Sequence, residues 1–378
     1  MAVITSNILL ILITILFRNH KMMINTGYKL LELFIALTTL RFVFPFELPF
    51  TVTIWLEQFE FLSGIIAFFQ HGIMTLGTRE ISLWNLFEGV WLIGFIINLM
   101  HYILLCRRTR YLILANSLDV TKEEPYHSML ERICREHGKK NPFRILTVSG
   151  LNTFMIYGIF RPCILIPENR ELSEDKWNYI LSHEVSHHFH HDLLIKTLTR
   201  FVTMIYWWNP AGRILNKQAD VILEMRADNV VAAYSKETIV NYLHCLTELG
   251  ELATKQNAFP NAVTLSLLTA EDSALIQRYH MLASSGKKKN IFVNIILCTL
   301  FISIYAASHL FIFEAYYTSP EAAESIPQTE NNTYAVLKEN GTYDIYYLHY
   351  FIENVDSLEY YFSDIHIYTE KEFLSEEH

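Results

Sequence analysis

Two histidines near the middle of the chain have the spacing of a metal-binding pair. His183 and His187 lie four residues apart in the run YILSHEVSHH, which covers residues 179–188. Residues four apart on a helix lie one turn above each other on the same face, so both imidazoles can reach one ion. Glu184 follows the first histidine, and its carboxylate projects near that ion without binding it. This pattern predicts a Zn²⁺ site in which Glu184 takes a proton from a metal-activated water.

The surrounding stretch is rich in histidine, so a polar helix face with recurring histidines is the alternative explanation. His187 and His191 are also four residues apart and form a competing metal pair. Glu184 favours the pair of His183 and His187, because only that pair places a carboxylate beside the open coordination position.

A catalytic zinc usually has three protein ligands, so a third must come from elsewhere in the chain. The extended motif H-E-x-x-H-x-x-G-x-x-H fails, because the chain has His190 and Leu193 where glycine and histidine are needed. Glu224 fits as the third ligand, in the otherwise apolar helical stretch VILEMRAD over residues 221–228. Asp228 lies one turn later and is predicted to accept a hydrogen bond from a ligand histidine, which fixes its tautomer. A solvated acidic pair is the alternative.

The elements that must position these residues are a mixture of helices and short strands. Ser173 followed by two acids predicts the start of the motif helix. A strand over 154–160 is our candidate edge for pairing with an extended peptide, and a plain structural strand is the alternative. The other predicted strands cover 144–148 and 163–167, and the other predicted helices cover 126–137, 197–208, 214–234 and 236–250.

Four apolar runs predict membrane helices, at residues 2–17, 30–46, 90–106 and 291–313. Glu32 and Arg41 lie inside the second run, where placement near the membrane interfaces is the expected explanation. The interrupted apolar piece over 61–74 resembles an interfacial or re-entrant segment.

Basic clusters indicate one orientation for all four predicted spans. They lie around Arg18, at 107–110 and at 287–289, whereas the loop over 47–82 and the tail after Glu314 are acidic. We therefore expect both termini outside the cell. The expected domains are three transmembrane helices in 1–110 with an external loop at 47–82, a cytoplasmic domain in 111–290, a fourth transmembrane helix at 291–313 and a short acidic external tail at 314–378.

Composition agrees with a chain that is partly membrane-embedded and partly soluble. The 378 residues are 51% hydrophobic and only 18% charged. A net charge of −9 argues against direct nucleic-acid binding. The five cysteines show no C-x-x-C spacing and are expected to be free thiols in a reducing compartment. The expected fold class is an α-helical multi-pass membrane protein with a cytoplasmic α+β metallopeptidase domain.

Several motifs resemble one known family. They are LRFVFPF at 40–46, YGIFRP at 157–162, ILIP at 164–167, YILSHE at 179–184 running to Asp192, WWNP at 207–210, and the stretch from Glu224 to Asp228. Residues 1 to about 314 thus resemble the BlaR/MecR-type membrane metallopeptidases, which are antirepressor or signal-transducer gluzincins of bacterial plasma membranes. The resemblance implies that His183, His187 and Glu224 bind zinc and that Glu184 is the catalytic base.

The same resemblance suggests partners. The best-known members cleave themselves and trigger the loss of a transcriptional repressor after a β-lactam acylates an external domain. This chain departs from them, because no S-x-x-K motif follows the fourth apolar run and residues 314–378 are too few for a penicillin-binding fold. The leading hypothesis is a zinc endopeptidase in the lipid bilayer that cleaves itself or a cytoplasmic regulator. The alternatives are a quality-control or CAAX-type processing peptidase, and a receptor whose peptidase-like domain is inert.

Overall fold

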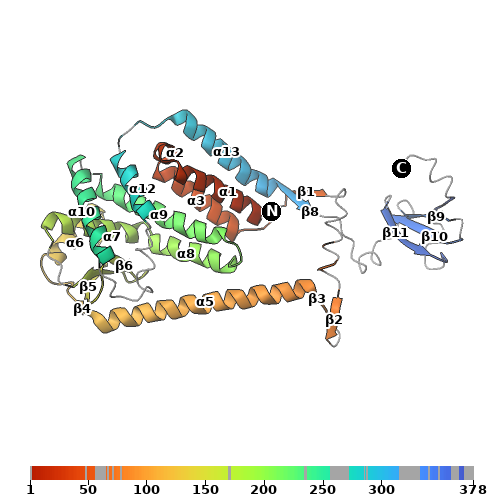
Figure 1. The fold of residues 1–378 in the computed structure, drawn as a ribbon, viewed down its shortest axis with the longest axis horizontal. Coiled ribbons are helices and arrows are strands. Elements are labelled where there is room, and N and C mark those ends of the chain that lie inside the picture. The colour runs from red at the N-terminus through yellow and green to blue at the C-terminus, as the bar shows by residue number, and fades with distance from the viewer. Residues whose placement is uncertain are drawn as a thin grey trace. The chain divides into compact units, whose positions relative to one another are not determined.

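The computed structural model describes residues 2–46, 49–55, 65, 68–69, 72–76, 79–168, 172–233, 236–255, 272–284, 286, 288–314, 333–338, 341–347, 350–358 and 366–369. The chain divides into two compact units (Figure 1). The first unit comprises Met1–Ile54 and Asn85–Phe313, and the second comprises Trp55–Trp84 and Glu314–His378. All of the predicted site residues lie in the first unit.

One half of the first unit is a bundle of helices around an apolar core. Leu9 and Ile13 from the first helix, Leu31 from the third, and Leu215 and Met225 from α9 (Ala211–Val231) are all fully buried in it. The N-terminal apolar helices therefore pack directly on the helix that carries Glu224. The helices are α1 (Ala2–Arg18), α2 (His20–Thr26), α3 (Tyr28–Val43), α8 (Asp192–Ile205), α9 (Ala211–Val231), α12 (Asp272–Ala283) and α13 (Ile291–Leu310).

The other half of the first unit is a four-stranded sheet covered by helices. The strands are β4 (Ser117–Asp119), β5 (Arg144–Val148), β6 (Met155–Tyr157) and β7 (Cys163–Pro167), in the order β4-β5-β7-β6. The central strands β5 and β7 are parallel, and β6 pairs antiparallel with β7 at one edge. The covering helices are α6 (Tyr126–Glu136) and α7 (Glu174–Phe189), and α10 (Lys236–Lys255) packs beside α7.

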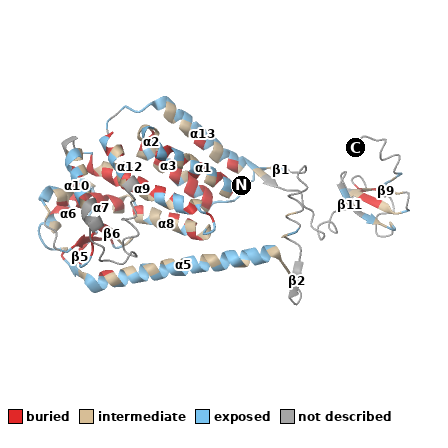
Figure 2. Cartoon of the chain, viewed as in Figure 1, coloured by how far each residue is buried: buried red, intermediate tan, exposed pale blue. Residues whose placement is uncertain are grey.

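Helix α7 lies between the sheet and the helical bundle, so its two faces have different tasks. Trp177 and Leu181 pack with Leu130 of α6 and Ile164 of β7 in a second apolar core. The opposite face of α7 packs on α9. Buried residues run along α7, α9 and the central strands, and also along α1 and α3 of the bundle (Figure 2).

Most predicted elements of this unit occur where the sequence indicated. The strands at 144–148 and 163–167 have the predicted bounds, and the helix predicted at 126–137 ends one residue earlier. The strand predicted over 154–160 is shorter, because Gly158 adopts a φ of 93° and the chain turns there. Ser173 precedes α7, although its side chain makes no capping hydrogen bond.

The membrane prediction is supported in part. Helices α5 (Leu83–Asn116) and α13 are long and apolar enough to cross a membrane. Among the described residues, a third candidate arises only if α1 and α2 form one span bent by 107°. The 16 residues of α3 reach only about 24 Å at 1.5 Å per residue, less than the ~30 Å of a hydrocarbon core. The four-span topology therefore stays a prediction.

Both candidate spans differ in length from the apolar runs that predicted them. Helix α5 extends well beyond the expected 90–106, and α13 ends at Leu310 because β8 (Phe311–Glu314) begins there and pairs with β1 (Val52–Trp55). Most of the segment predicted at 61–74 lies outside the described residues, as does Lys287.

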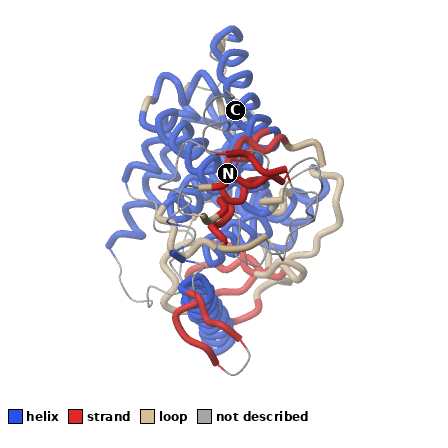
Figure 3. The backbone as a smooth tube through the Cα atoms, turned by 90° about the vertical axis from the view of Figure 1, so that its right-hand side faces the viewer, coloured by secondary structure: helices blue, strands red, loops and turns tan. Residues whose placement is uncertain are grey.

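The second unit contains small β-sheets (Figure 3). Strands β2 (Gly72–Leu76) and β3 (Arg79–Ser82) form an antiparallel pair. The strands β9 (Thr333–Leu337), β10 (Tyr343–Tyr347), β11 (Tyr350–Val355) and β12 (His366–Thr369) form a sheet in the order β11-β10-β9-β12. Tyr334 and Tyr346 stack on neighbouring strands with ring centroids 5.3 Å apart.

Candidate metal centre

The two motif histidines lie side by side on the buried face of α7. The Nε2 atoms of His183 and His187 are 3.1 Å apart, and their rings meet edge to face with centroids separated by 4.7 Å. Glu184 between them is 3% exposed. The helical spacing therefore does what the sequence suggested, and it directs one nitrogen of each ring to the same point.

Helix α9 brings Glu224 to that point. Its Oε2 lies 3.2 Å from Nε2 of His183, and its Oε1 lies 3.6 Å from Nε2 of His187. One ligand atom from each of the three residues falls within 4.8 Å of the others, and within the described part of the chain this is the one such group of three or more His, Cys, Asp or Glu. His191 is not part of it, because α7 ends at Phe189 and His191 is exposed with a φ of 61°.

These donors suit zinc. Two imidazole nitrogens and one carboxylate oxygen are a common ligand set of a catalytic zinc that leaves one position open. Glu184 supplies a second observation, because its Oε2 atom is buried and has no hydrogen-bond partner among the described residues. Buried polar atoms are nearly always satisfied, and a water held between the ion and Glu184 would satisfy this one.

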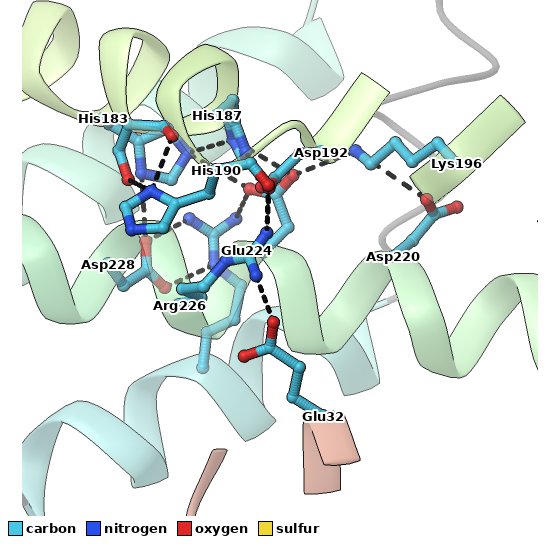
Figure 4. Close-up of polar contacts among 12 residues, drawn as sticks. Glu32, His183, His187, His190, Asp192, Lys196, Asp220, Glu224, Arg226 and Asp228 are labelled. Carbon is cyan, nitrogen blue, oxygen red and sulfur yellow. Dashed lines mark hydrogen bonds and ion pairs between the residues drawn. The ribbon is translucent and has the colours of Figure 1, made fainter. Parts of the chain in front are cut away.

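Asp228 of α9 and Tyr242 of α10 contact the far nitrogen of His183, and Arg278 of α12 holds Asp228 in turn; Figure 4 shows Asp228 beside His183. Its Nδ1 lies 2.9 Å from the Tyr242 hydroxyl and 3.3 Å from Oδ1 of Asp228, and the hydroxyl donates to the same Oδ1 at 2.7 Å. Arg278 donates to both oxygens of Asp228, at 2.7 and 2.8 Å. Burial alone would raise the pKa of Asp228, but Arg278 and His183 lower it to about 2. Asp228 thus lies beside Nδ1 of His183, and its predicted role as the acceptor of a ligand histidine stays a prediction.

The carboxylates also set the potential at the site. Burial opposes a charged imidazole, but Asp228 and Glu224 raise the pKa of His183 to about 10. The site therefore favours positive charge between these groups. Burial raises the pKa of Glu184 above its ordinary value.

His187 has its own supporting chain of charges. Its Nδ1 lies 2.6 Å from Oδ2 of Asp192, which is 1% exposed at the start of α8. Arg226 of α9 pairs with the other oxygen of Asp192 and with Glu32 of α3 (Figure 4). Sequence reasoning assigned no role to Asp192 or Arg226. The one sequence feature that could have pointed to Arg226 is its position, two residues after the predicted ligand Glu224.

A largely buried lysine, whose side chain is 14% exposed, also lies beside the candidate ligands. Lys196 Nζ is 3.5 Å from Oε1 of Glu224 and 3.7 Å from Oδ1 of Asp220. Burial alone would lower the pKa of Lys196, but Glu224 and Asp220 raise it above its ordinary value, so the ammonium stays charged. Its signal in the sequence was a single lysine in the apolar run LLIKTL over residues 193–198.

The candidate substrate strand lies at a sheet edge. β6 pairs with β7 on one side and has no strand on its other side within the described residues. Helix α7 packs against β6. This placement is compatible with the predicted pairing to an extended peptide, which stays a prediction.

Comparison with known proteins gives a consistent family assignment. The regulatory protein BlaR1 of Bacillus licheniformis is 26% identical over 188 residues, which are 49% of this chain and 30% of that protein. The methicillin resistance mecR1 protein of Staphylococcus aureus is 24% identical over 232 residues, 57% of this chain and 37% of that protein. The chain thus matches about a third of the length of these relatives.

A family match covers the part of the chain that carries the candidate site. The family described as BlaR1 peptidase M56 matches residues 73–282, more than half of the chain, and this range includes the motif helix α7 and the helix α9. The predicted BlaR/MecR resemblance is therefore confirmed, and the chain belongs to the BlaR1 peptidase M56 family.

Proposed function

We propose that this chain is an integral-membrane, zinc-dependent endopeptidase of the gluzincin type that acts in regulatory proteolysis. The observation that carries the proposal is the meeting of His183, His187 and Glu224 beside the unpartnered Oε2 of Glu184. The family assignment and the regulatory description of BlaR1 support the same conclusion.

Each residue has a chemical task in this proposal. His183, His187 and Glu224 would hold the ion, and zinc in such a site lowers the pKa of a water and polarises the scissile carbonyl. Glu184 accepts a proton from the attacking water at Oε2 and delivers it to the leaving amine. Asp192 orients His187 by accepting from its Nδ1, and Asp228 orients His183 together with the Tyr242 hydroxyl, which lies 2.9 Å from Nδ1 of His183 and donates to Asp228.

We further propose the membrane arrangement predicted from the charges. The metallopeptidase domain covers 111–290 in the cytoplasm, between three transmembrane helices in 1–110 and a fourth at 291–313, with both termini outside a bacterial plasma membrane. The apolar character of α5 and α13 supports this arrangement. The protein substrate of the proposed peptidase would be the chain itself or a cytoplasmic regulator such as a transcriptional repressor.

The test compares Glu184→Gln with wild type in the full-length chain, expressed in bacterial membranes. Loss of a general base typically costs about 10²–10⁴-fold in rate, so cleavage should fall by that factor while the zinc content stays at one per chain. Cleavage is read as fragments of the chain and of added repressor by intact mass, and metal by atomic absorption. Glu174→Gln is the matched control, because Glu174 is exposed in the first turn of the same helix.

Two results would contradict the proposal. Unchanged cleavage in Glu184→Gln would remove Glu184 as the base. Absence of stoichiometric zinc in the wild-type chain would favour a receptor with an inert peptidase-like domain.

A further inference from the structure

A run of four charged or polar side chains connects the apolar helix α3 to a predicted metal ligand. It starts at Glu32 on α3, passes through Arg226 on α9 and Asp192 at the start of α8, and ends at Nδ1 of His187 (Figure 4). Glu32 is separated from His187 by 155 positions in the sequence, so only the packing of α3 on α8 and α9 brings it here. The expectation that Glu32 lies near a membrane interface gave no reason to connect it with the site.

Burial makes these contacts specific. The side chains of Asp192 and Arg226 are only 2% and 11% exposed, and that of Glu32 is 31% exposed. A guanidinium has its donors fixed in one plane, so the position of one partner constrains the direction of the other. Arg226 Nη2 pairs with Asp192 and also donates to the His190 carbonyl at 3.4 Å, whereas Nη1 pairs with Glu32.

Arg226 has little else to hold it. Its Nε atom is buried and has no hydrogen-bond partner within the described residues. Removing the carboxylate of Glu32 would therefore leave both Nε and Nη1 without an ionic partner in a largely buried place, where unpaired charge is costly. The guanidinium would turn toward water, and Oδ1 of Asp192 would lose its ion pair with Arg226. Oδ2 of the same carboxylate, which faces His187, would then be held less firmly.

We propose that Glu32 is a positioning residue of the metal centre. Through Arg226 and Asp192 it makes the orientation of His187 depend on how α3 is seated against α8 and α9. This inference rests on the proposed function, because it requires that His187 bind the metal. An ordinary ion pair between helices, which holds α3 in place without affecting the ligand, is the competing explanation.

The test measures metal binding rather than proteolysis. Zn²⁺ affinity is determined for the full-length chain in detergent by competition with a chromophoric chelator, and the visible spectrum of the Co²⁺-loaded chain reports ligand geometry. Partners behind a metal ligand typically change affinity by about 10–100-fold. Glu32 contacts His187 only indirectly, through Arg226 and Asp192. Glu32→Gln should therefore weaken Zn²⁺ binding by about 3–10-fold, which is less than the effect of a direct partner. It should also change the Co²⁺ spectrum.

Two further variants separate positioning from general destabilisation. Glu32→Asp keeps the carboxylate and should recover part of the affinity. Glu88→Gln is the matched control, because Glu88 is an exposed glutamate on the apolar helix α5 and should leave binding unchanged.

A double variant tests the route. If Glu32 acts through Asp192, Glu32→Gln should cost no further affinity once Asp192→Asn is present. A Glu32→Gln chain that binds Zn²⁺ within twofold of wild type with an unchanged Co²⁺ spectrum would overturn the inference. The inference would also be overturned if Glu32→Gln lowered Zn²⁺ affinity as much in the Asp192→Asn chain as in the wild-type chain. Failure of the wild-type chain to bind Zn²⁺ would instead overturn the proposed function.

Discussion

Replacing Tyr242 with phenylalanine removes one buried oxygen atom and leaves the ring in place. The hydroxyl donates to Asp228 at 2.7 Å and lies 2.9 Å from Nδ1 of His183. A hydrogen bond to a charged group contributes about 1.5–3 kcal/mol to stability. Asp228 keeps both bonds from Arg278, so we expect the lower end, about 1.5 kcal/mol. At about 2–4 °C per kcal/mol for a domain of this size, Tm should fall by about 3–6 °C.

The same substitution should weaken metal binding by a limited amount. Nδ1 of His183 already lies 3.3 Å from Oδ1 of Asp228, so a small rotation of the ring restores a direct hydrogen bond. We therefore expect Tyr242→Phe to reduce Zn²⁺ affinity about tenfold, the lower end of the range for such partners. Asp228→Asn should cost more, because it removes the charged acceptor of the Tyr242 hydroxyl and leaves Arg278 with Glu224 as its remaining carboxylate partner.

Chelator competition and thermal unfolding of the detergent-solubilised chain measure both effects. Tyr179→Phe is the control, because the Tyr179 ring packs edge-on against Tyr242 and its hydroxyl makes no hydrogen bond within the described residues. The reasoning is refuted if Tyr242→Phe binds Zn²⁺ within twofold of wild type. It is equally refuted if Asp228→Asn binds as tightly as Tyr242→Phe.

Two other predictions concern titrating groups outside the site. Burial raises the pKa of Cys134 and Cys245 to about 11, so iodoacetamide at pH 8 should label them only after unfolding in SDS, as counted by intact mass; fast labelling of the folded chain would contradict this. Hydrogen bonds from Thr121 and Arg144 lower the pKa of Asp119 from 3.8 to about 2. The stabilisation from ionised Asp119 is therefore complete above pH 3.8 and lost as the pH falls toward 2. The difference in Tm between wild type and Asp119→Asn should shrink over that interval, and a constant difference would refute the assignment.

The part of the site that could be predicted from sequence is the part with fixed local spacing. His183 and His187 are four residues apart on one helix, as are Glu224 and Asp228 on another, so helical geometry alone places each pair on one face and Glu184 beside the first pair. The prediction that the two pairs meet came from the chemistry of zinc, because a catalytic zinc usually needs a third protein ligand.

The supporting residues could not be predicted in this way. Tyr242, Arg278 and Glu32 lie on three other helices, and each reaches the site only through tertiary packing, whereas Asp192 lies five residues after His187 across the turn between α7 and α8. No periodicity within a helix encodes which helix will lie beside it. The strand order β4-β5-β7-β6 escaped prediction for the same reason, although the bounds of β5 and β7 were clear.

The predicted length of a helix was wrong where a cluster of charged residues was taken as the end of that helix. The basic run at 107–110 was expected to follow the third span, but α5 continues through it to Asn116. Arginine is a good helix former, so a basic cluster indicates where lipid ends and carries no signal to end the helix.

The packing of α9 has a consequence for how this chain tolerates insertions. One stripe of the helix, with Leu215, Ile222 and Met225, lies in the apolar core, while another carries Glu224 and Asp228 to the site. Because each residue advances an α-helix by about 100°, one residue inserted between Leu215 and Ile222 would rotate the two parts of α9 against each other. The carboxylates would then turn away from the site, or the apolar side chains of one part would leave the core. Insertions and deletions should therefore be tolerated in the connections before and after α9. Within α9 the number of residues must stay constant to keep both the core packing and the site.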